Sequence, residues 1–193
     1  MNTIVNEQGR LLGYNTDVSG FQAALRSVLP DGARGAKCLL VGAGGAARAV
    51  VAGLVEEDAA SVTICNRTPA RARSLCEVAA KWGATSCQTV VSDRIAEAVT
   101  VADLIVNATP VGLGGAVKDS PLPVDRIRGG QVVVDLAYGV SATTLVEAAG
   151  GRGAVAIDGK EMLIMQAACS YGLWTGLQPP IEAMRRSIEH GER

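Results

Sequence analysis

The sequence is poor in aromatic residues and histidine and contains no long uninterrupted apolar run. Aromatic side chains make up 3% of the 193 residues, and the single histidine, His190, lies in a polar C-terminal stretch. A histidine-based metal site or catalytic triad is therefore not expected. No apolar run approaches the ~20 residues that span a bilayer, and the first residues show no basic and apolar leader pattern. We expect no membrane segment.

An excess of charge of one sign and paired cysteines are also lacking. The formal net charge is −1, and lysine and arginine form no block, so neither nucleic acid nor an anionic membrane is an expected partner. The cysteines show no metal-binding or redox spacing, and several stand in aliphatic runs, where a thiol acts as a small apolar side chain. They are Cys38, Cys65, Cys76, Cys87 and Cys169. These features predict a reduced, cytoplasmic protein without a metal ion.

The sequence does have many glycines, 23 in all, and short aliphatic runs that alternate with segments of helical pattern. The runs predict strands at 37–42, 61–65, 85–91, 103–107, 131–136 and 154–157. Helices are expected between them, and two more around Pro179-Pro180. Such alternation is typical of a parallel sheet with right-handed crossovers. The expected fold is α/β, a doubly wound, mostly parallel sheet of the Rossmann type, in a single domain over 1–193.

The N-terminal residues precede this pattern. The first fifteen predict a short hairpin with a turn at Glu7-Gln8-Gly9. A helix is expected from about Asp17, because apolar residues recur at helical spacing from Val18 to Val28, and Pro30 should end it.

The clearest motif is the run Gly42-Ala43-Gly44-Gly45-Ala46-Ala47, which matches the dinucleotide pattern G-x-G-x-x-G/A. A predicted strand precedes it and a predicted helix follows it, which is the context that this pattern requires. Gly42 permits a tight turn, Gly44 lets the backbone approach a pyrophosphate, and Ala47 lets helix and strand pack closely. The pyrophosphate would lie at the helix N-terminus. The alternative is a glycine-rich turn without a ligand.

The second predicted strand is followed by Asn66-Arg67-Thr68-Pro69-Ala70-Arg71. Proteins that bind NAD carry an acidic residue here, on the ribose hydroxyls, and this segment has none. Arg67 and Arg71 lie four residues apart across a predicted helix start, so both guanidinium groups can reach the same phosphate. We interpret the pair as a site for the 2′-phosphate of NADP. The alternative is two solvated surface arginines.

Two further polar segments are candidates. The run Asn107-Ala108-Thr109-Pro110 follows a strand at the edge where doubly wound sheets bind ligands, so it predicts a loop that lines a cofactor; an ordinary turn would have a similar composition. The run Asn15-Thr16-Asp17 precedes the first helix. On sequence alone, Asp17 is most simply a helix-start carboxylate, favoured by the helix dipole.

Seven ordered segments resemble the shikimate dehydrogenase family, and in particular its C-terminal, cofactor-binding part. They are Asn2-Thr3, GYNTDVSGF (13–21), VGAGGAA (41–47), NRTPAR (66–71), NATPVG (107–112), DLAYGV (135–140) and DGKEMLIMQA (158–167). The resemblance implies an NADP-binding Rossmann domain. It also implies reversible hydride transfer between NADPH and 3-dehydroshikimate, giving shikimate for aromatic amino-acid biosynthesis.

The resemblance further implies roles for individual residues. Asp17 corresponds to the aspartate of a catalytic acid/base pair, and Asn2 and Gln166 correspond to amides that bind the substrate together with Asp17. The family's cofactor-contacting positions match Gly42, Ala43, Gly44, Gly45, Ala46, Ala47, Asn66, Arg67, Thr68, Arg71, Thr109, Tyr138, Gly159 and Met162.

The family's catalytic lysine, and the hydroxyl residues that bind the substrate carboxylate, belong to an N-terminal domain that does not precede Met1 here. We therefore expect 1–15 to be a remnant of the junction with that domain. The face that such a domain would cover, formed by the hairpin, the first helix and the C-terminal helices, should self-associate or bind a partner. The chain alone should oxidise little or no shikimate. Lys160 is the one conceivable substitute base, and a solvated loop lysine is the simpler interpretation. The alternatives to a shikimate dehydrogenase are a non-catalytic NADP-binding module, a pseudo-enzyme, and a quinate or aminoshikimate dehydrogenase.

Overall fold

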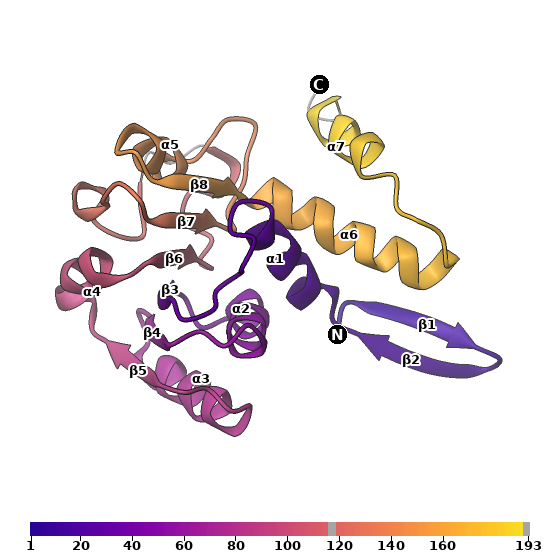
Figure 1. Cartoon of the computed structure of the whole chain (residues 1–193), viewed down its shortest axis with the longest axis horizontal. Helices are drawn as coiled ribbons and strands as arrows, with labels where there is room; N and C mark the ends of the chain where they lie inside the picture. Colours follow the sequence, from indigo (N-terminus) through magenta and orange to yellow (C-terminus); the bar gives the residue numbers. More distant parts are fainter. Residues whose placement is uncertain (116–118, 191–193) are drawn as a thin grey trace.

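The computed structural model describes residues 1–115 and 119–190, which form a parallel six-stranded sheet with helices on both faces and a projecting two-stranded hairpin (Figure 1). The strands are β1 (Thr3–Glu7), β2 (Arg10–Tyr14), β3 (Lys37–Val41), β4 (Ser61–Cys65), β5 (Cys87–Val90), β6 (Leu104–Asn107), β7 (Val132–Asp135) and β8 (Val155–Asp158). The α-helices are α1 (Thr16–Arg26), α2 (Gly45–Glu56), α3 (Pro69–Lys81), α4 (Ile95–Val101), α5 (Thr144–Gly151), α6 (Gly159–Thr175) and α7 (Ile181–His190). Short 3-10 turns are η1 (Ser92–Arg94), η2 (Leu113–Gly115) and η3 (Val124–Arg126).

The strand order of the sheet is β5-β4-β3-β6-β7-β8, and each neighbouring pair is parallel. The chain therefore begins the sheet in its middle, builds outward through β4 and β5, and then crosses to β6 on the other side of β3. This is the doubly wound order, and ligands bind at its reversal point, here between β3 and β6. The predicted fold class is confirmed.

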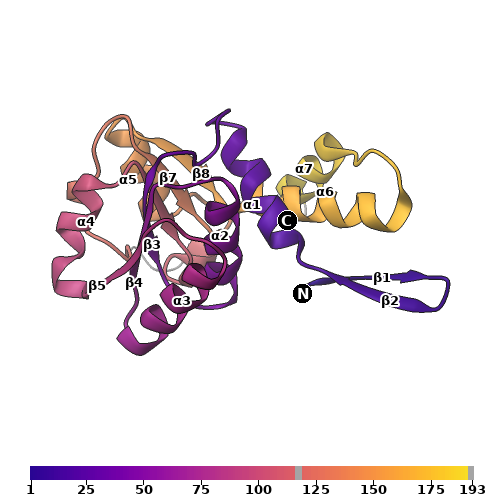
Figure 2. The same cartoon turned by 60° about the horizontal axis from the view of Figure 1, so that its bottom comes forward.

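Alternate residues of β3 face two different apolar layers. Cys38 and Leu40 pack with side chains from α1, α2 and α3, whereas Leu39 and Val41 pack with side chains from α4 and α5. The two layers are seen on the two sides of the sheet in Figure 2. Both faces are covered, which explains why the sheet strands read as continuous aliphatic runs in the sequence.

Helices α1 and α6 pack closely although they lie at opposite ends of the chain (Figure 1). A Cβ atom on Gly20 would lie 2.6 Å from Cβ of Gln166 and 2.7 Å from its backbone nitrogen. Since real Cβ atoms do not approach so closely, the pair requires glycine at position 20. The contact brings the N-terminal residues beside α6.

The hairpin turns at Gln8 and Gly9, whose φ angles are 52° and 90°. Positive φ values are typical of the tight turns that join hairpin strands, and glycine adopts them readily. The predicted turn is confirmed. The hairpin is attached to α6, because Nε1 of Trp174 donates a 3.0 Å hydrogen bond to the carbonyl oxygen of Ile4.

The first helix is shorter than the apolar spacing predicted. It ends at Arg26, and Oγ of Ser27 donates a 2.7 Å hydrogen bond to the Ala24 carbonyl. Val28, which was expected on the buried face, is 36% exposed. Thr68 is the N-cap residue of α3, but its side chain makes no capping hydrogen bond there.

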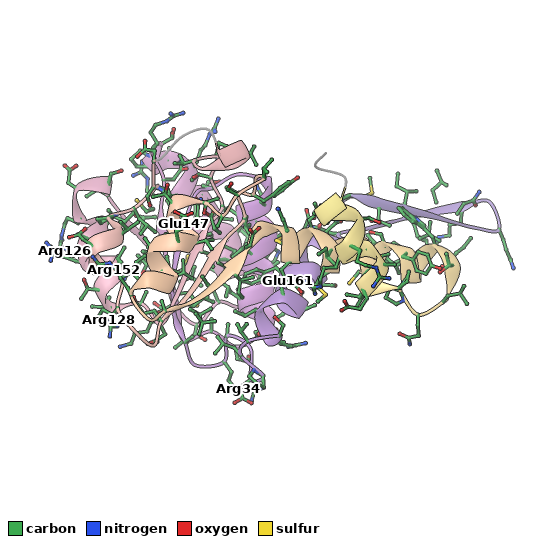
Figure 3. All side chains as sticks on the ribbon, turned by 90° about the horizontal axis from the view of Figure 1, so that it is seen from above. Arg34, Arg126, Arg128, Glu147, Arg152 and Glu161 are labelled. Carbon is green, nitrogen blue, oxygen red and sulfur yellow. The ribbon has the colours of Figure 1, made fainter. Side chains whose placement is uncertain are left out.

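Several charged side chains gather at the end of the molecule remote from the hairpin, where Figure 3 labels Arg126, Arg128, Glu147 and Arg152. Arg128 and Arg152 come shortly before β7 and β8, so they lie at the amino edge of the sheet. This edge is opposite to the one where the ligand crevice opens. In the part of the chain that the structure describes, no helix is both long and apolar enough to cross a membrane.

Candidate functional site

A cavity of about 540 Å³ opens at the carboxyl edge of the sheet, around the ends of β3, β4 and β6. Its walls come from the turns after these strands, the start of α4 and one further loop. The lining residues are Val41, Gly42, Ala43, Gly44, Cys65, Asn66, Arg67, Arg71, Ser92, Ile95, Ala108, Thr109, Pro110, Val111, Ser120, Pro121, Leu122 and Pro123. The cavity therefore lies at the reversal point of the sheet, where the fold predicts a ligand.

The glycine-rich turn after β3 forms one wall. Gly42 has a φ of 115°, and a Cβ atom there would lie 2.8 Å from the Ala108 carbonyl oxygen, so the fold itself requires this glycine. A Cβ atom on Gly44 would meet no protein atom within 4 Å. Helix α2 begins beside it without a side-chain cap or an acidic residue in its first turn. These features suit an anion, because the backbone N–H groups of a helix N-terminus are left for one to bind.

Arg67 and Arg71 line the same cavity, and both side chains are exposed. Nδ2 of Asn66 donates a 2.8 Å hydrogen bond to the Thr68 carbonyl, which fixes the turn before α3. None of the described residues that line the cavity is acidic. The structure thus brings the two arginines together at one ligand cavity, as their spacing predicted.

The loop after β6 forms the wall next to the glycine turn, since a Cβ atom on Gly42 would lie 2.8 Å from the Ala108 carbonyl oxygen. Oδ1 of Asn107 accepts hydrogen bonds from the backbone nitrogen and Oγ1 of Thr109, at 2.9 and 2.7 Å. The sequence predicted this wall. It did not predict that the loop of residues 120–123 also lines the cavity. Leu122 anchors that loop, since it is buried in the apolar layer of α4 and α5. The two prolines, Pro121 and Pro123, were the sequence signal for a loop at this position.

Tyr138, Gly159 and Met162 lie outside the lining of this cavity. Tyr138 is 38% exposed in the loop after β7. Gly159 begins α6, and a Cβ atom there would lie 2.6 Å from the Leu136 carbonyl oxygen. Met162 is buried in the apolar layer of α1 and α2. Gly159 and Met162 are therefore closely packed within the protein, and neither borders the cavity of Gly42 and Arg67.

A second polar site lies where the start of α1 meets α6, and it joins all three residues that the resemblance assigned to the substrate. Nδ2 of Asn2 donates a 2.8 Å hydrogen bond to Oδ1 of Asp17. Oδ1 of Asn2 accepts from the backbone nitrogen of Thr16 at 2.9 Å. Oγ1 of Thr16 in turn donates to Oε1 of Gln166 at 3.3 Å.

Three buried hydroxyl residues lie next to this second site: Thr3, Thr16 and Ser170. Oγ of Ser170 lies 2.8 Å from Oγ1 of Thr3 and 3.0 Å from Oγ1 of Thr16, and it donates to the Gln166 carbonyl at 3.1 Å. The sequence singles out the segments of Thr3 and Thr16 but not the role of their hydroxyls, and it gives no sign of Ser170. Thr3 and Ser170 are 167 residues apart, so no local pattern could relate them.

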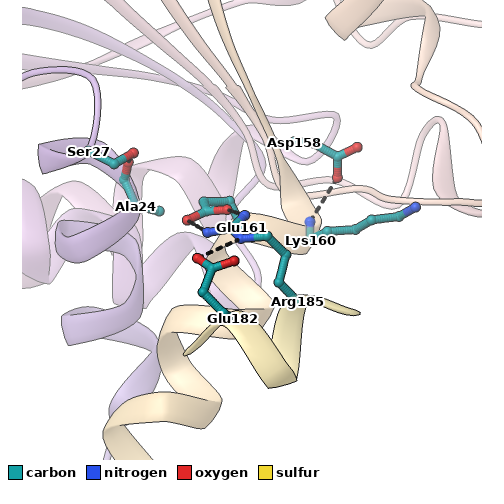
Figure 4. A network of polar contacts seen from close by, with 7 residues as sticks. All are labelled: Ala24, Ser27, Asp158, Lys160, Glu161, Glu182 and Arg185. Carbon is teal, nitrogen blue, oxygen red and sulfur yellow. Dashed lines mark hydrogen bonds and ion pairs between the residues drawn. The ribbon is translucent and has the colours of Figure 1, made fainter. Parts of the chain in front are cut away.

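Lys160 is not a loop residue, contrary to the simpler sequence interpretation. It lies in the first turn of α6, half-buried, and its backbone nitrogen donates a 2.8 Å hydrogen bond to Oδ1 of Asp158 (Figure 4). It lines another cavity, of about 460 Å³, which neither Asn2, Asp17 nor Gln166 borders. Beside it, Arg185 of α7 forms a two-pronged ion pair with Glu161 of α6, also drawn in Figure 4.

The strand order, the glycine turn at the reversal point and the cavity beside it define an α/β protein of the Rossmann class. Comparison with known families gives a narrower assignment. The family model described as shikimate / quinate 5-dehydrogenase matches residues 24–138, and that of the shikimate 5′-dehydrogenase C-terminal domain matches residues 159–189. The chain belongs to the shikimate dehydrogenase family.

Individual relatives agree with this assignment. The chain is 41% identical to the shikimate dehydrogenase (NADP(+)) of Moorella thermoacetica and 40% identical to that of Pelodictyon phaeoclathratiforme, in each case over 97% of its own length. It spans only 64% and 66% of the length of these two curated relatives.

Two solved structures show the same likeness. A quinate dehydrogenase from Corynebacterium glutamicum, in complex with NAD, is 32% identical with a TM-score of 0.88, over 96% of this chain and 66% of that one. A shikimate 5-dehydrogenase from Thermus thermophilus, in complex with NADP(H) and shikimate, is 35% identical with a TM-score of 0.78, over 95% and 65%.

Proposed function

We propose that this chain is the NADP-binding domain of an NADP-dependent shikimate dehydrogenase. One observation carries the proposal: a single cavity at the reversal point contains the glycine turn at Gly42 and Gly44 together with Arg67 and Arg71, and none of the described residues that line it is acidic. The pyrophosphate would lie at the start of α2, and the two guanidinium groups would bind the 2′-phosphate. The NADP(+) named for the curated relatives supports the same cofactor.

Bound NADPH supplies a hydride, which together with a proton reduces a substrate carbonyl to an alcohol. In this chain, Asn2, Asp17 and Gln166 would orient the hydroxyl groups of 3-dehydroshikimate or shikimate. Asp17 would exchange the proton as one member of an acid/base pair. Their hydrogen-bonded arrangement at the junction of α1 and α6 supports this assignment. We also propose, on the resemblance, that Asn66, Thr68, Thr109, Tyr138, Gly159 and Met162 contact the cofactor.

Quinate is the competing substrate, since a quinate dehydrogenase is among the similar structures. That protein is in complex with NAD, whereas the paired Arg67 and Arg71 of this chain favour NADP. A non-catalytic NADP-binding module is the alternative from another functional class. It would bind the cofactor equally well but would have no use for a hydrogen-bonded Asn2, Asp17 and Gln166.

Two measurements test the proposal. Titration calorimetry should show NADP bound at least about a hundredfold more tightly than NAD, because two charge-assisted hydrogen-bonding groups favour the phosphate. Equal dissociation constants would overturn the cofactor assignment. The absorbance of NADPH should then report oxidation of shikimate in preference to quinate, with this chain combined with the rest of a family member. Preference for quinate, or tight NADP binding without turnover in any such combination, would favour the respective alternative.

We further propose that the chain self-associates. A second copy of the chain would pack on the apolar face formed by the hairpin and the end of α6. Large apolar side chains are exposed on the hairpin and at the end of α6, which project from the sheet (Figures 1 and 2): Ile4 is 52% exposed, Leu11 70%, Trp174 61% and Leu177 62%. Such patches on soluble proteins mark interaction sites. Sedimentation should show a mass that rises with concentration, and Leu11→Lys should abolish the rise. A monomer at all concentrations would contradict the proposal.

A cytoplasmic location is also proposed. It is supported by the cysteines, which are all free thiols in this structure: Cys38, Cys65, Cys76, Cys87 and Cys169. Fractionation of the source cells, followed by detection of the chain with an antibody, tests it; recovery outside the cytoplasmic fraction would contradict it.

A further inference from the structure

Asp135, at the carboxyl end of β7, is a fully buried carboxylate to which no function has been given above. Its Oδ1 accepts hydrogen bonds from Nδ2 of Asn107 at 2.7 Å and from the backbone nitrogen of Ala137 at 3.1 Å. Its Oδ2 accepts from Oγ1 of Thr143 at 2.6 Å. A buried carboxylate is costly unless donors surround it, so this position has been built around a hydrogen-bond acceptor.

Asn107 carries the effect of this carboxylate to the cofactor cavity. While its Nδ2 donates to Asp135, its Oδ1 accepts both the backbone nitrogen and Oγ1 of Thr109. The Thr109 hydroxyl also accepts from the backbone nitrogen of Val111 at 3.3 Å. Thr109, Pro110 and Val111 are all part of the cavity wall. The wall is therefore fixed to Asp135 through a single intermediate side chain.

The same carboxylate also closes the loop that follows β7. Ala137 donates to it from the beginning of this loop and Thr143 from its end, just before α5. Tyr138 lies between them, and its carbonyl oxygen accepts a 2.9 Å hydrogen bond from Gly114, in the loop after β6. The loops after two adjacent strands are thus joined at one buried residue.

We infer that Asp135 is a positioning residue for the cofactor: through Asn107 and the ends of the next loop, it holds Thr109 and Tyr138 in the positions needed to bind NADP. The inference rests on the proposed function, since it presumes that the cavity takes this dinucleotide. Asp135 does not line the cavity and acts only through its neighbours. Its removal should lower cofactor affinity although no contact to the cofactor is lost.

An amide cannot replace this carboxylate fully. The three hydrogen bonds need acceptors at both oxygens, whereas asparagine has one acceptor oxygen and a donor NH₂ group. In Asp135→Asn, the NH₂ group must therefore face either Thr143 or the Asn107 and Ala137 donors. Thr143→Val removes one donor to Asp135 and the N-cap acceptor of Val146 in α5, and it leaves the Asn107 branch in place.

Glu57 provides a matched control. Its carboxylate is also buried, with a side chain 2% exposed, and it accepts the backbone nitrogen of Ala33 at 2.7 Å and pairs with Arg26 at 2.9 Å. It lies at the end of α2 and does not border the cofactor cavity. Glu57→Gln therefore disturbs a buried carboxylate of the same kind whose partners, Ala33 and Arg26, lie outside the loops of β6 and β7.

The experiment measures NADP dissociation constants by calorimetry, and melting temperatures, for the wild-type chain and the three variants. We expect Asp135→Asn to weaken NADP binding about tenfold or more and Thr143→Val to weaken it less, as a lost hydrogen bond to a charged group predicts. Glu57→Gln should lower the melting temperature and leave NADP affinity unchanged. Should Asp135→Asn fail to fold, Thr143→Val against Glu57→Gln decides the question.

The outcomes separate the two hypotheses. If the wild-type chain binds NADP and the Asp135 and Thr143 variants bind it equally well, the inference is wrong and the proposed function stands. It is also wrong if affinity falls in Glu57→Gln as well, in proportion to lost stability, because Asp135 is then merely structural. If the wild-type chain binds no NADP, the proposed function itself fails, and the inference with it.

Discussion

The side-chain amide of Asn2 donates a 2.8 Å hydrogen bond to the carboxylate of Asp17, which joins the residue before β1 to the first turn of α1. Asn15, not Asp17, is the N-cap of this helix, and its side chain accepts from the Asp17 nitrogen at 3.3 Å. The Asp17 carboxylate is thus held by a residue from another element, an arrangement that a simple helix-start carboxylate does not need.

Replacement of Asp17 by asparagine separates the two interpretations of this residue. The variant should bind NADP as the wild-type chain does, because Asp17 does not line the cofactor cavity. It should lose about 1 kcal/mol of stability or less, and its turnover with shikimate in an active assembly should fall. The matched control, Asn15→Ala, should cost about 1 kcal/mol as a lost N-cap and leave turnover unchanged. Equal turnover in both variants would leave Asp17 as a helix-start residue only.

The two glycines of the turn after β3 should respond differently to alanine. Gly42→Ala places a Cβ atom 2.8 Å from a carbonyl oxygen at a positive φ, so the melting temperature should fall markedly. Gly44→Ala meets no protein atom, so the melting temperature should stay the same while NADP affinity falls, because the added methyl group occupies space kept for the pyrophosphate. Calorimetry and thermal melting measure both quantities. Unchanged NADP affinity in Gly44→Ala would mean that the pyrophosphate binds elsewhere.

The double change Arg67→Ala and Arg71→Ala should remove most of the preference for NADP over NAD. Each guanidinium group is expected to contribute about 1.5–3 kcal/mol through charge-assisted hydrogen bonds to the 2′-phosphate. Affinity for NAD should change little, since NAD lacks that phosphate. Arg73→Ala serves as the control, because Arg73 is an exposed residue of α3 that does not line the cavity. A preference that survives the double change would place the 2′-phosphate on other residues.

The stability contributed by Asp135 should depend on pH in a defined direction. Burial raises the pKa of this carboxyl above its ordinary value of 3.8, against the lowering effect of the hydrogen bonds from Thr143, Asn107 and Ala137, and the nearby Asp158 raises it further. The folded chain therefore binds this proton more tightly than the unfolded chain. The contribution is present below pH 3.8 and is lost as pH rises through the raised pKa.

Urea unfolding at a series of pH values tests this sign. The free energy of unfolding of the wild-type chain, relative to that of Asp135→Asn, should decrease as pH rises above 3.8 and then become constant. Only the slope is predicted, because the asparagine variant also loses hydrogen bonds at every pH. A difference that increases with pH would show that the hydrogen bonds outweigh burial at this carboxyl.

Most of the sheet and the cofactor cavity could be predicted from the sequence because their signals are local. A buried parallel strand is a short aliphatic run, and the glycine turn and arginine pair each lie within six consecutive residues at a strand end. The polar cluster at α1 and α6 was identified through resemblance alone. Thr3 and Thr16 lie in segments that the sequence singles out, but their supporting role, and Ser170 altogether, were missed because isolated serines and threonines carry no pattern.

Other differences have equally physical reasons. Apolar spacing extended the first helix to Val28, but a side chain can follow the spacing without being covered by a neighbour, and the helix ends at Arg26. Lys160 follows a strand and a glycine, which resembles a loop, whereas Asp158 caps a helix at that point and places Lys160 in its first turn. No sequence pattern indicated the hydrogen bonds of Asp135, because its side-chain donors come from β6 and from the end of the next loop.

The contact between α1 and α6 also sets an order of events during synthesis. The glycine turn, both arginines and the loop of Thr109 lie between β3 and β7, so all the residues that line their cavity, and Asp135 and Thr143 behind it, have been made before α6. Asn2 and Asp17 are synthesised before the sheet, yet they meet Gln166 only after every strand of the sheet has been synthesised. Contacts between such distant residues form late, because a long loop must be closed first. A nascent chain of this protein would therefore form the cavity of Gly42 and Arg67 well before the hydrogen-bonded cluster of Asn2, Asp17 and Gln166. A messenger cut short before α6 would encode that cavity without the cluster, and without Gly159 and Met162.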